Sequence, residues 1–214
     1  MRRDIREGGA AVWVVAIVLS IVILVVVIIG VGFNPYAHDF AYTLSGTHGN
    51  VTGEDVMMEN RLLTRHVLSY VLFFSDLPQG YFTFDEVDHL VDVRRLVYGS
   101  LLVSLASILV LLFFPRSVWM RARIRTGYIL LVVSGLFMLT SLVNIEQFRR
   151  AFLAFHVVFF PMGNYAFSAE SALIQTYPPS FFYALVALIF LGILGVAVAL
   201  VMVRKWSRSD ENLS

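Results

Sequence analysis

The chain has 214 residues, of which 58% are hydrophobic and only 14% are charged, and its mean hydropathy is +0.78. Because a soluble domain carries about 25% charged residues, this composition excludes an ordinary soluble protein and predicts an integral membrane protein. The net charge of +1 gives no indication of a nucleic-acid partner. The sequence contains no cysteine, which excludes disulfides, thiolate chemistry and a thioester intermediate on the protein itself.

Four apolar segments are predicted to cross the membrane as helices, since a span requires about 20 predominantly apolar residues. These segments are residues 10–33, 96–114, 127–143 and 181–203. The first segment follows a short basic stretch, residues 1–9, and a secretory signal peptide is its alternative interpretation. We favour a retained helix, because the apolar region of a signal peptide is usually about 7–15 residues long and this run is longer.

The distribution of lysine and arginine predicts the orientation of these spans. Ten of the 16 basic residues lie in residues 1–9, 115–126 and 204–214, which all face one side if the chain crosses four times. The positive-inside rule makes that side cytoplasmic, so both termini lie there and residues 115–126 form a cytoplasmic loop. Residues 34–95 and 144–180 are then extracytoplasmic, and they contain all five histidines. We therefore expect an all-α integral membrane protein of the plasma membrane, with four transmembrane helices, an extracytoplasmic helical cap and an active site at the outer leaflet.

The first outer segment ends in a helix that is predicted to begin at Phe84 and to continue into the second span. Thr83 and Glu86 have the spacing of a capping box, in which each side chain accepts from a backbone N–H of the first turn. His89 lies about 10 Å above the span along this helix, and Asp92 and Glu86 lie three residues to either side of it. A carboxylate at that spacing can orient an imidazole that acts as a general base. The alternative is a solvated helix terminus whose acids only complement the helix dipole.

The second outer segment contains an aromatic helix that is too short to span a bilayer, so we expect residues 151–160 to lie at the membrane interface. Its apolar stripe at helical spacing consists of Phe148, Phe152, Phe155 and Phe159. His156 lies among these rings, and no acidic residue occupies a neighbouring helical position, so a carboxylate partner would have to come from elsewhere in the fold. The alternative is a buried structural histidine that bonds to a carbonyl group.

Several common catalytic and metal-binding patterns are absent from the sequence. No two histidines are four residues apart and no H-E-x-x-H motif occurs, so the sequence predicts neither a metal site nor a cofactor. The nucleophile elbow, the Walker loop and the Rossmann fingerprint are also missing. The predicted spans contain no charged residue, which argues against a transporter or channel subunit with a proton relay. A non-enzymatic membrane protein such as a cap or chaperone would need the aromatic stripe but not the histidines, and both alternatives remain open at this point.

Two motifs in the outer segments resemble the lipoprotein intramolecular transacylase (Lit) family. The first covers residues 81–93 and contains the acidic sequence H-L-V-D-V, which begins at His89. The second combines residues 155–160, which include His156, with residues 173–178 and the following Phe-Phe pair. The layout of four spans with an outer cap is similar to that family as well.

This resemblance implies an acyl shift within one lipoprotein substrate. An ester-linked acyl chain of the diacylglyceryl group on the N-terminal cysteine would move to the α-amine of that cysteine and give the lyso form. The implied partners are a diacylated lipoprotein and membrane lipids. Because the nucleophile is a substrate amine with a pKa of about 8, an imidazole with a pKa of about 6.5 can remove its proton, and no enzyme serine or cysteine is needed.

On this resemblance we expect His89 and His156 to be the catalytic pair, with Asp92 orienting His89. The candidate substrate-binding residues are Tyr70, Tyr81, Arg94, Phe152, Phe159 and Tyr165. Arg94 lies at an outer membrane edge, where contact with a lipid phosphate and simple snorkelling are equally open. The chain departs from the family pattern after Asn164, where Tyr165 or Phe167 takes the place of an expected tryptophan and an expected Asp-Pro pair is absent.

Overall fold

The computed structural model describes residues 2–46, 54–141 and 143–211, and within these ranges it contains eight α-helices and no strand. The helices are α1 (Arg2–Gly32), α2 (Pro35–Ser45), α3 (Glu54–Phe73), α4 (Phe84–Leu112), α5 (Arg116–Ser141), α6 (Ile145–Phe159), α7 (Ala172–Thr176) and α8 (Pro179–Glu211). The predicted all-α class is therefore confirmed.

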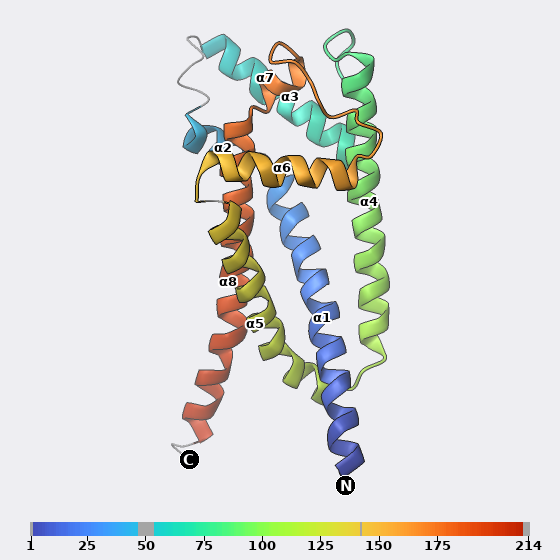
Figure 1. The fold of residues 1–214 in the computed structure, drawn as a ribbon, viewed down its shortest axis with the longest axis vertical. Coiled ribbons are helices and arrows are strands. Elements are labelled where there is room, and N and C mark those ends of the chain that lie inside the picture. The colour runs from blue at the N-terminus through green and yellow to red at the C-terminus, as the bar shows by residue number, and fades with distance from the viewer. Residues whose placement is uncertain (1, 47–53, 142, 212–214) are drawn as a thin grey trace.

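Helices α1, α4, α5 and α8 form a bundle, and each has an apolar stretch long enough to cross a membrane. These stretches are Gly9–Gly32, Phe84–Leu112, Arg116–Leu139 and Pro179–Met202. Many of their apolar side chains point outward, and Leu102, for example, keeps 66% of its surface exposed. Such a surface suits hydrocarbon rather than water, so the structure agrees with four membrane helices. Figure 1 shows both termini and the α4–α5 turn at one end of the bundle, with α2, α3, α6 and α7 at the other.

The connection between α4 and α5 differs from the sequence-based expectation of a loop at residues 115–126. Helix α5 already begins at Arg116, and the turn is confined to residues 113–115. Val118 and Ala122, one helical turn apart, are buried against α1 in a cluster that includes Val15. This apolar contact stabilises helix in a stretch whose arginines suggested a loop. The terminal residues 2–9 and 204–211 are likewise continuations of α1 and α8.

Helix α8 is the element on which the membrane half and the cap half both pack. Its buried residues Phe181 and Ile193 lie at different levels of one core, which also contains Leu90 of α4. Helix α5 approaches α8 closely at Gly127, where an added Cβ would lie 2.7 Å from Cγ2 of Val201. A small residue is required at such a contact because it lets two membrane helices pack closely.

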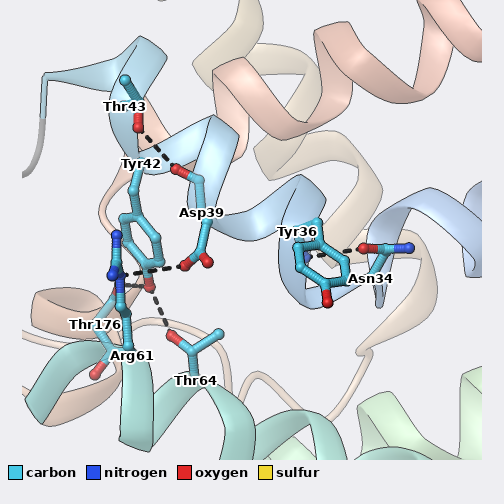
Figure 2. Close-up of polar contacts among 8 residues, drawn as sticks. All are labelled: Asn34, Tyr36, Asp39, Tyr42, Thr43, Arg61, Thr64 and Thr176. Atoms are coloured by element: carbon cyan, nitrogen blue, oxygen red, sulfur yellow. Dashed lines mark hydrogen bonds and ion pairs between the residues drawn. The ribbon is translucent and has the colours of Figure 1, made fainter. Parts of the chain in front are cut away.

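Tyr42 of α2 ties the cap helices to one another. Its side chain is 1% exposed, and its hydroxyl lies 3.0 Å from Oγ1 of Thr64 on α3 and donates to the carbonyl oxygen of Thr176 on α7 at 2.6 Å (Figure 2). An ion pair of 3.5 Å between Arg61 and Asp39 joins α3 to α2 beside it. A buried hydroxyl must be hydrogen-bonded to be tolerated, so these contacts select one arrangement of the cap.

Candidate active site

The first turn of α4 is built by the predicted capping box, which the structure confirms. The Thr83 hydroxyl accepts from the Glu86 N–H at 3.4 Å, and Oε2 of Glu86 accepts from the Thr83 N–H at 2.7 Å. Glu86 is 1% exposed, and its Oε1 accepts from the N–H of Leu173 on α7 at 2.8 Å. Both carboxylate oxygens are therefore engaged in holding the cap together. Glu86, one of the two predicted carboxylate partners of His89, has a structural role instead.

The side chains of His89 on α4 and His156 on α6 meet where the C-terminal end of α6 lies beside α4 (Figure 1). Their ring centroids are 6.0 Å apart and the rings are inclined by only 22°. His89 is 6% exposed and His156 is 8% exposed. Phe160, which follows α6, contacts both rings, with centroid distances of 4.7 Å to His89 and 5.3 Å to His156. The predicted convergence of the two histidines is confirmed, and the site around them is aromatic and largely dry.

The tautomer of His156 is fixed by its own helix. Nδ1 of His156 lies 2.7 Å from the carbonyl oxygen of Phe152, one turn earlier on α6. A carbonyl oxygen only accepts, so Nδ1 carries the proton and Nε2 presents a lone pair. Burial lowers the pKa of His156, and the bond to the Phe152 carbonyl acts in the opposite direction. The predicted structural alternative, a histidine bonded to a carbonyl, is thus present, and it prepares a neutral imidazole with a free basic nitrogen.

His89 is held differently from His156. Its Nδ1 is buried and makes no hydrogen bond to any residue that the structure describes. Asp92 was predicted to orient this ring, but its Oδ1 accepts from Arg95 at 2.8 Å and its Oδ2 accepts from Asn164 at 2.9 Å. Burial and the neighbouring His156 favour a neutral His89 imidazole, and the charges of Asp92 and Asp88 offset them only in part. Negative charge at this position stabilises an imidazolium that forms during proton transfer.

Asn164 connects the loop between α6 and α7 to the acidic face of α4. Its Nδ2 donates to Oδ2 of Asp88 and to Oδ2 of Asp92, both at 2.9 Å. The next residue, Tyr165, lies with its ring centroid 5.2 Å from that of His156, and Phe167 lies 5.6 Å from His89. Asp88, Asn164, Phe160 and Phe167 were not among the predicted site residues. Two sequence signals bear on this contact: Asn164 matches the asparagine expected from the family pattern, and the four-residue spacing of Asp88 and Asp92 puts both carboxylates on one helix face.

Three of the six predicted substrate-binding residues lie at or beside the histidine pair. The ring centroid of Phe152 lies 4.1 Å from that of His156, and the ring centroid of Tyr165 lies 5.2 Å from that of His156. Phe159 stacks on Phe155 at 4.7 Å and is 48% exposed, so it lies on the outer side of α6.

The other three predicted substrate-binding residues lie elsewhere. Arg94 donates to the Tyr70 hydroxyl at 3.0 Å, and its guanidinium lies 4.3 Å from the centre of the Tyr70 ring. Arg94 follows His89 by five residues, which turns it about 140° around α4, away from the histidine pair. Tyr81 is 42% exposed and lines a separate cavity of about 300 Å³ between α3, α7 and the start of α4. The structure therefore does not place Tyr70, Arg94 and Tyr81 beside the histidine pair.

A family model described as lipoprotein intramolecular transacylase Lit matches residues 13–182. The chain belongs to the Lit family. None of the curated proteins matches it. Among solved structures, Lit from Bacillus cereus has a TM-score of 0.81 at 18% identity and covers 98% of this chain and 99% of its own. Two variants of that protein, each with one histidine replaced, have TM-scores of 0.69 and 0.63, also at 18% identity and with at least 96% of each chain covered.

Membership of the Lit family decides between the functions that the sequence left open. The chain is an integral membrane enzyme, an intramolecular transacylase that acts on lipoproteins. The alternatives, a transporter or channel subunit and a non-enzymatic membrane protein, are not supported. At 18% identity the solved Lit structures show a shared fold, so the roles of individual residues in this chain rest on its own geometry.

The arrangement can perform proton transfer without any nucleophile of its own. Among the described residues, no group of three or more histidine, aspartate or glutamate side chains could hold a metal ion. The stacked imidazoles offer one fixed basic nitrogen, on His156, and a second ring beside two carboxylates, on His89. A pair of this kind can accept a proton at one point of a substrate and return it at another.

Proposed function

We propose that this chain moves the ester-linked acyl chain on the second glyceryl carbon of a diacylglyceryl-cysteine lipoprotein to the α-amine of that cysteine. His89 and His156 form the acid–base pair of this reaction. The observation that carries the proposal is the contact of the two imidazoles, 6.0 Å between centroids, with the tautomer of His156 fixed by the Phe152 carbonyl. The two rings come from different helices and are enclosed by aromatic side chains, as an acyl-transfer site for lipids requires.

His156 acts as the base in the first half of the reaction. Its Nε2 accepts a proton from the substrate α-amine as the amine nitrogen attacks the ester carbonyl carbon. The new C–N bond produces a tetrahedral intermediate with a negative oxygen, which needs hydrogen-bond donors or positive charge nearby. The His89 ring, stacked on His156, can direct a ring N–H at this oxygen as a hydrogen-bond donor.

The second half of the reaction returns the proton. The bond between the carbonyl carbon and the glyceryl oxygen breaks, and the leaving alkoxide takes a proton from an imidazolium of the pair. The products are an amide on the cysteine nitrogen and a free hydroxyl on the second glyceryl carbon, so no water or co-substrate is consumed. Since nucleophile and ester already belong to one molecule, the protein contributes only the orientation part of the roughly 7–11 kcal/mol that a well-aligned intramolecular reaction gains over a bimolecular one.

Helix α6 gives lipid chains a route to this pair. Its outward face carries exposed apolar side chains next to His156, with Leu153 55% exposed, Val157 56% exposed and Val158 70% exposed. Figure 1 shows α6 lying across the bundle rather than along it. An apolar helix in this orientation rests in the outer leaflet, so acyl chains of the substrate can remain in hydrocarbon while the ester reaches the imidazoles.

The proposal is tested by expressing the chain in cells whose lipoproteins carry only diacylglyceryl-cysteine, and by analysing a lipoprotein N-terminus by mass spectrometry. Wild type should produce the lyso form with an amide-linked acyl chain. His89→Ala and His156→Ala should each lower its formation by about 100-fold or more, the usual contribution of a positioned acid or base. His66→Ala is the matched control, because His66 is exposed on α3 and should be dispensable. If His89→Ala or His156→Ala keeps full activity, the histidine replaced in that variant is not part of the mechanism.

A further inference from the structure

Among the described residues, only the Asn164 side chain donates hydrogen bonds to two carboxylates, and both lie more than 70 residues away in the sequence. Its amide group has two N–H donors, and one goes to each of Asp88 and Asp92, both at 2.9 Å. Asp88 and Asp92 lie on successive turns of one face of α4, and two like charges at that spacing repel each other. A neutral amide between them supplies a donor to each, and hydrogen bonds to ionised acceptors are the stronger kind.

The amide orientation is set by these partners. The Asn164 Oδ1 atom is buried and makes no hydrogen bond to any described residue. Rotating the amide by 180° would gain no hydrogen bond, because it would place the acceptor Oδ1 against two negative carboxylates. Leaving one buried acceptor unpaired is unfavourable. The side chain tolerates this only because both donors are engaged, so the contact is specific to an amide with two free N–H groups.

The loop between α6 and α7, residues 160–171, is shaped to deliver this contact. Gly163 has a positive φ of 78° and donates its N–H to the carbonyl of Phe160 at 3.1 Å, which closes a tight turn directly before Asn164. A side chain is disfavoured at that φ, so glycine is required there. Figure 1 shows that the loop passes along α4 before it reaches α7. Tyr165 and Phe167, the next residues, then contact His156 and His89 respectively.

We propose that Asn164 is a positioning residue for the transacylase reaction. Its bridge to Asp88 and Asp92 holds the α6–α7 loop against α4 and so keeps the rings of Tyr165 and Phe167 on the histidine pair. The amide does not touch the reacting atoms. It acts through the two rings, which fix the imidazoles and exclude water from them. This inference rests on the proposed roles of the two histidines.

The first test compares hydrogen–deuterium exchange of residues 160–171 in purified wild type, Asn164→Ala and Ser168→Ala, all without substrate. Ser168 is exposed on the same loop, and its side chain serves as the matched control. We expect faster exchange of the loop in Asn164→Ala alone, with the exchange of α6 unchanged. Because no turnover is measured, this result is independent of whether the histidines are catalytic. Equal loop exchange in all three proteins overturns the proposal.

The second test measures kcat and KM of the same proteins with a synthetic diacylated lipopeptide in lipid nanodiscs. Loss of the bridge should lower kcat by about 10- to 100-fold, because misplacing groups at a reacting centre by about 1 Å has effects of that size. The change in KM should be smaller, since the lipid chains are bound elsewhere. A purely stabilising role would lower the thermal midpoint and leave kcat of the folded fraction at the wild-type value, and that outcome also contradicts the proposal.

A double-mutant cycle identifies the partner. Asp88→Ala removes one of the two acceptors of Asn164 without touching Asp92. If the two residues act through one contact, Asp88→Ala combined with Asn164→Ala should behave like Asn164→Ala alone in loop exchange. Strictly additive effects would show that Asn164 acts without Asp88 and would refute the bridge.

Discussion

At the scale of single residues, the acid–base chemistry depends on where each imidazole carries its proton. The Phe152 carbonyl keeps the proton of His156 on Nδ1, and burial lowers the pKa of this histidine below its usual 6.5. A base must be unprotonated, and so must the substrate amine, whose pKa is about 8. We predict that log kcat/KM rises with pH with slope two below the His156 pKa, and with slope one between that pKa and the pKa of the amine. The change of slope should fall below pH 6.5, measured with the diacylated lipopeptide.

Tyr165 provides the control for this pH dependence. Its ring lies 5.2 Å from His156 and shields the imidazole from water. In Tyr165→Ala the loss of burial should raise the pKa of His156, so the change of slope moves to higher pH. Tyr165→Phe keeps the aromatic ring, so the change of slope should stay at the wild-type pH. An identical profile in wild type and Tyr165→Ala would mean that burial does not set the pKa of this base.

The residues of the site differ in how far sequence could predict them. His156 is recognisable as a lone ionisable group in an aromatic helix, and His89 as the histidine of the acidic H-L-V-D-V motif. Asn164 is not, since its partners lie far away in the chain and nothing local distinguishes its amide from a loop amide. Arg94 was predicted to bind substrate because it lies at an outer membrane edge, but its five-residue separation from His89 turns it about 140° to another face of α4. The angle between two residues of one helix follows from their spacing, whereas the contact of Asn164 with α4 depends on the path of the loop.

At the scale of elements, α4 could be predicted from its first residue because its capping box is local. Helix α3, Glu54–Phe73, is also local in origin, because Val56, Leu63, Val67 and Tyr70 recur at helical spacing. The short α7 has no comparable signal, since it spans only Ala172–Thr176 and its first turn depends on the carboxylate of Glu86 from α4. Helix α5 begins earlier than its hydropathy suggests, because burial of Val118 and Ala122 against α1 outweighs the arginines around them.

Glu86 therefore links the stability of two elements. Glu86→Ala removes the acceptor for the Thr83 and Leu173 N–H groups and leaves the buried Leu173 donor unpaired. We predict a loss of about 3 kcal/mol in the free energy of unfolding, from the lost cap and the unpaired donor together. Asp85→Ala is the matched control, since Asp85 occupies the same first turn but is exposed, and it should lose only about 0.5 kcal/mol through the helix dipole. The measurement is the thermal midpoint of wild type, Glu86→Ala and Asp85→Ala in one detergent. Equal midpoints for Glu86→Ala and wild type would contradict the structural role of Glu86.

At the scale of the whole molecule, the fold separates two ends of different chemistry. The termini and the α4–α5 turn gather at one end, and the cap helices, which include the α6 that carries His156, lie at the other (Figure 1). Ten of the 16 basic residues belong to segments at the first end, although most of residues 115–126 are helical there. The positive-inside rule depends on the charge of a flank and not on its secondary structure, so the correction to that segment leaves the predicted orientation unchanged.

The predicted orientation determines from which side of the membrane a thiol reagent can reach an introduced cysteine. The chain contains no cysteine, so a single introduced thiol is labelled without background. Ser168 is exposed in the cap and Ser117 is exposed at the start of α5, at opposite ends of the bundle. In intact protoplasts, a membrane-impermeant maleimide should label Ser168→Cys at once and Ser117→Cys only after the membrane is permeabilised. The reverse pattern would place the cap and the histidine pair on the cytoplasmic side and would contradict the predicted orientation.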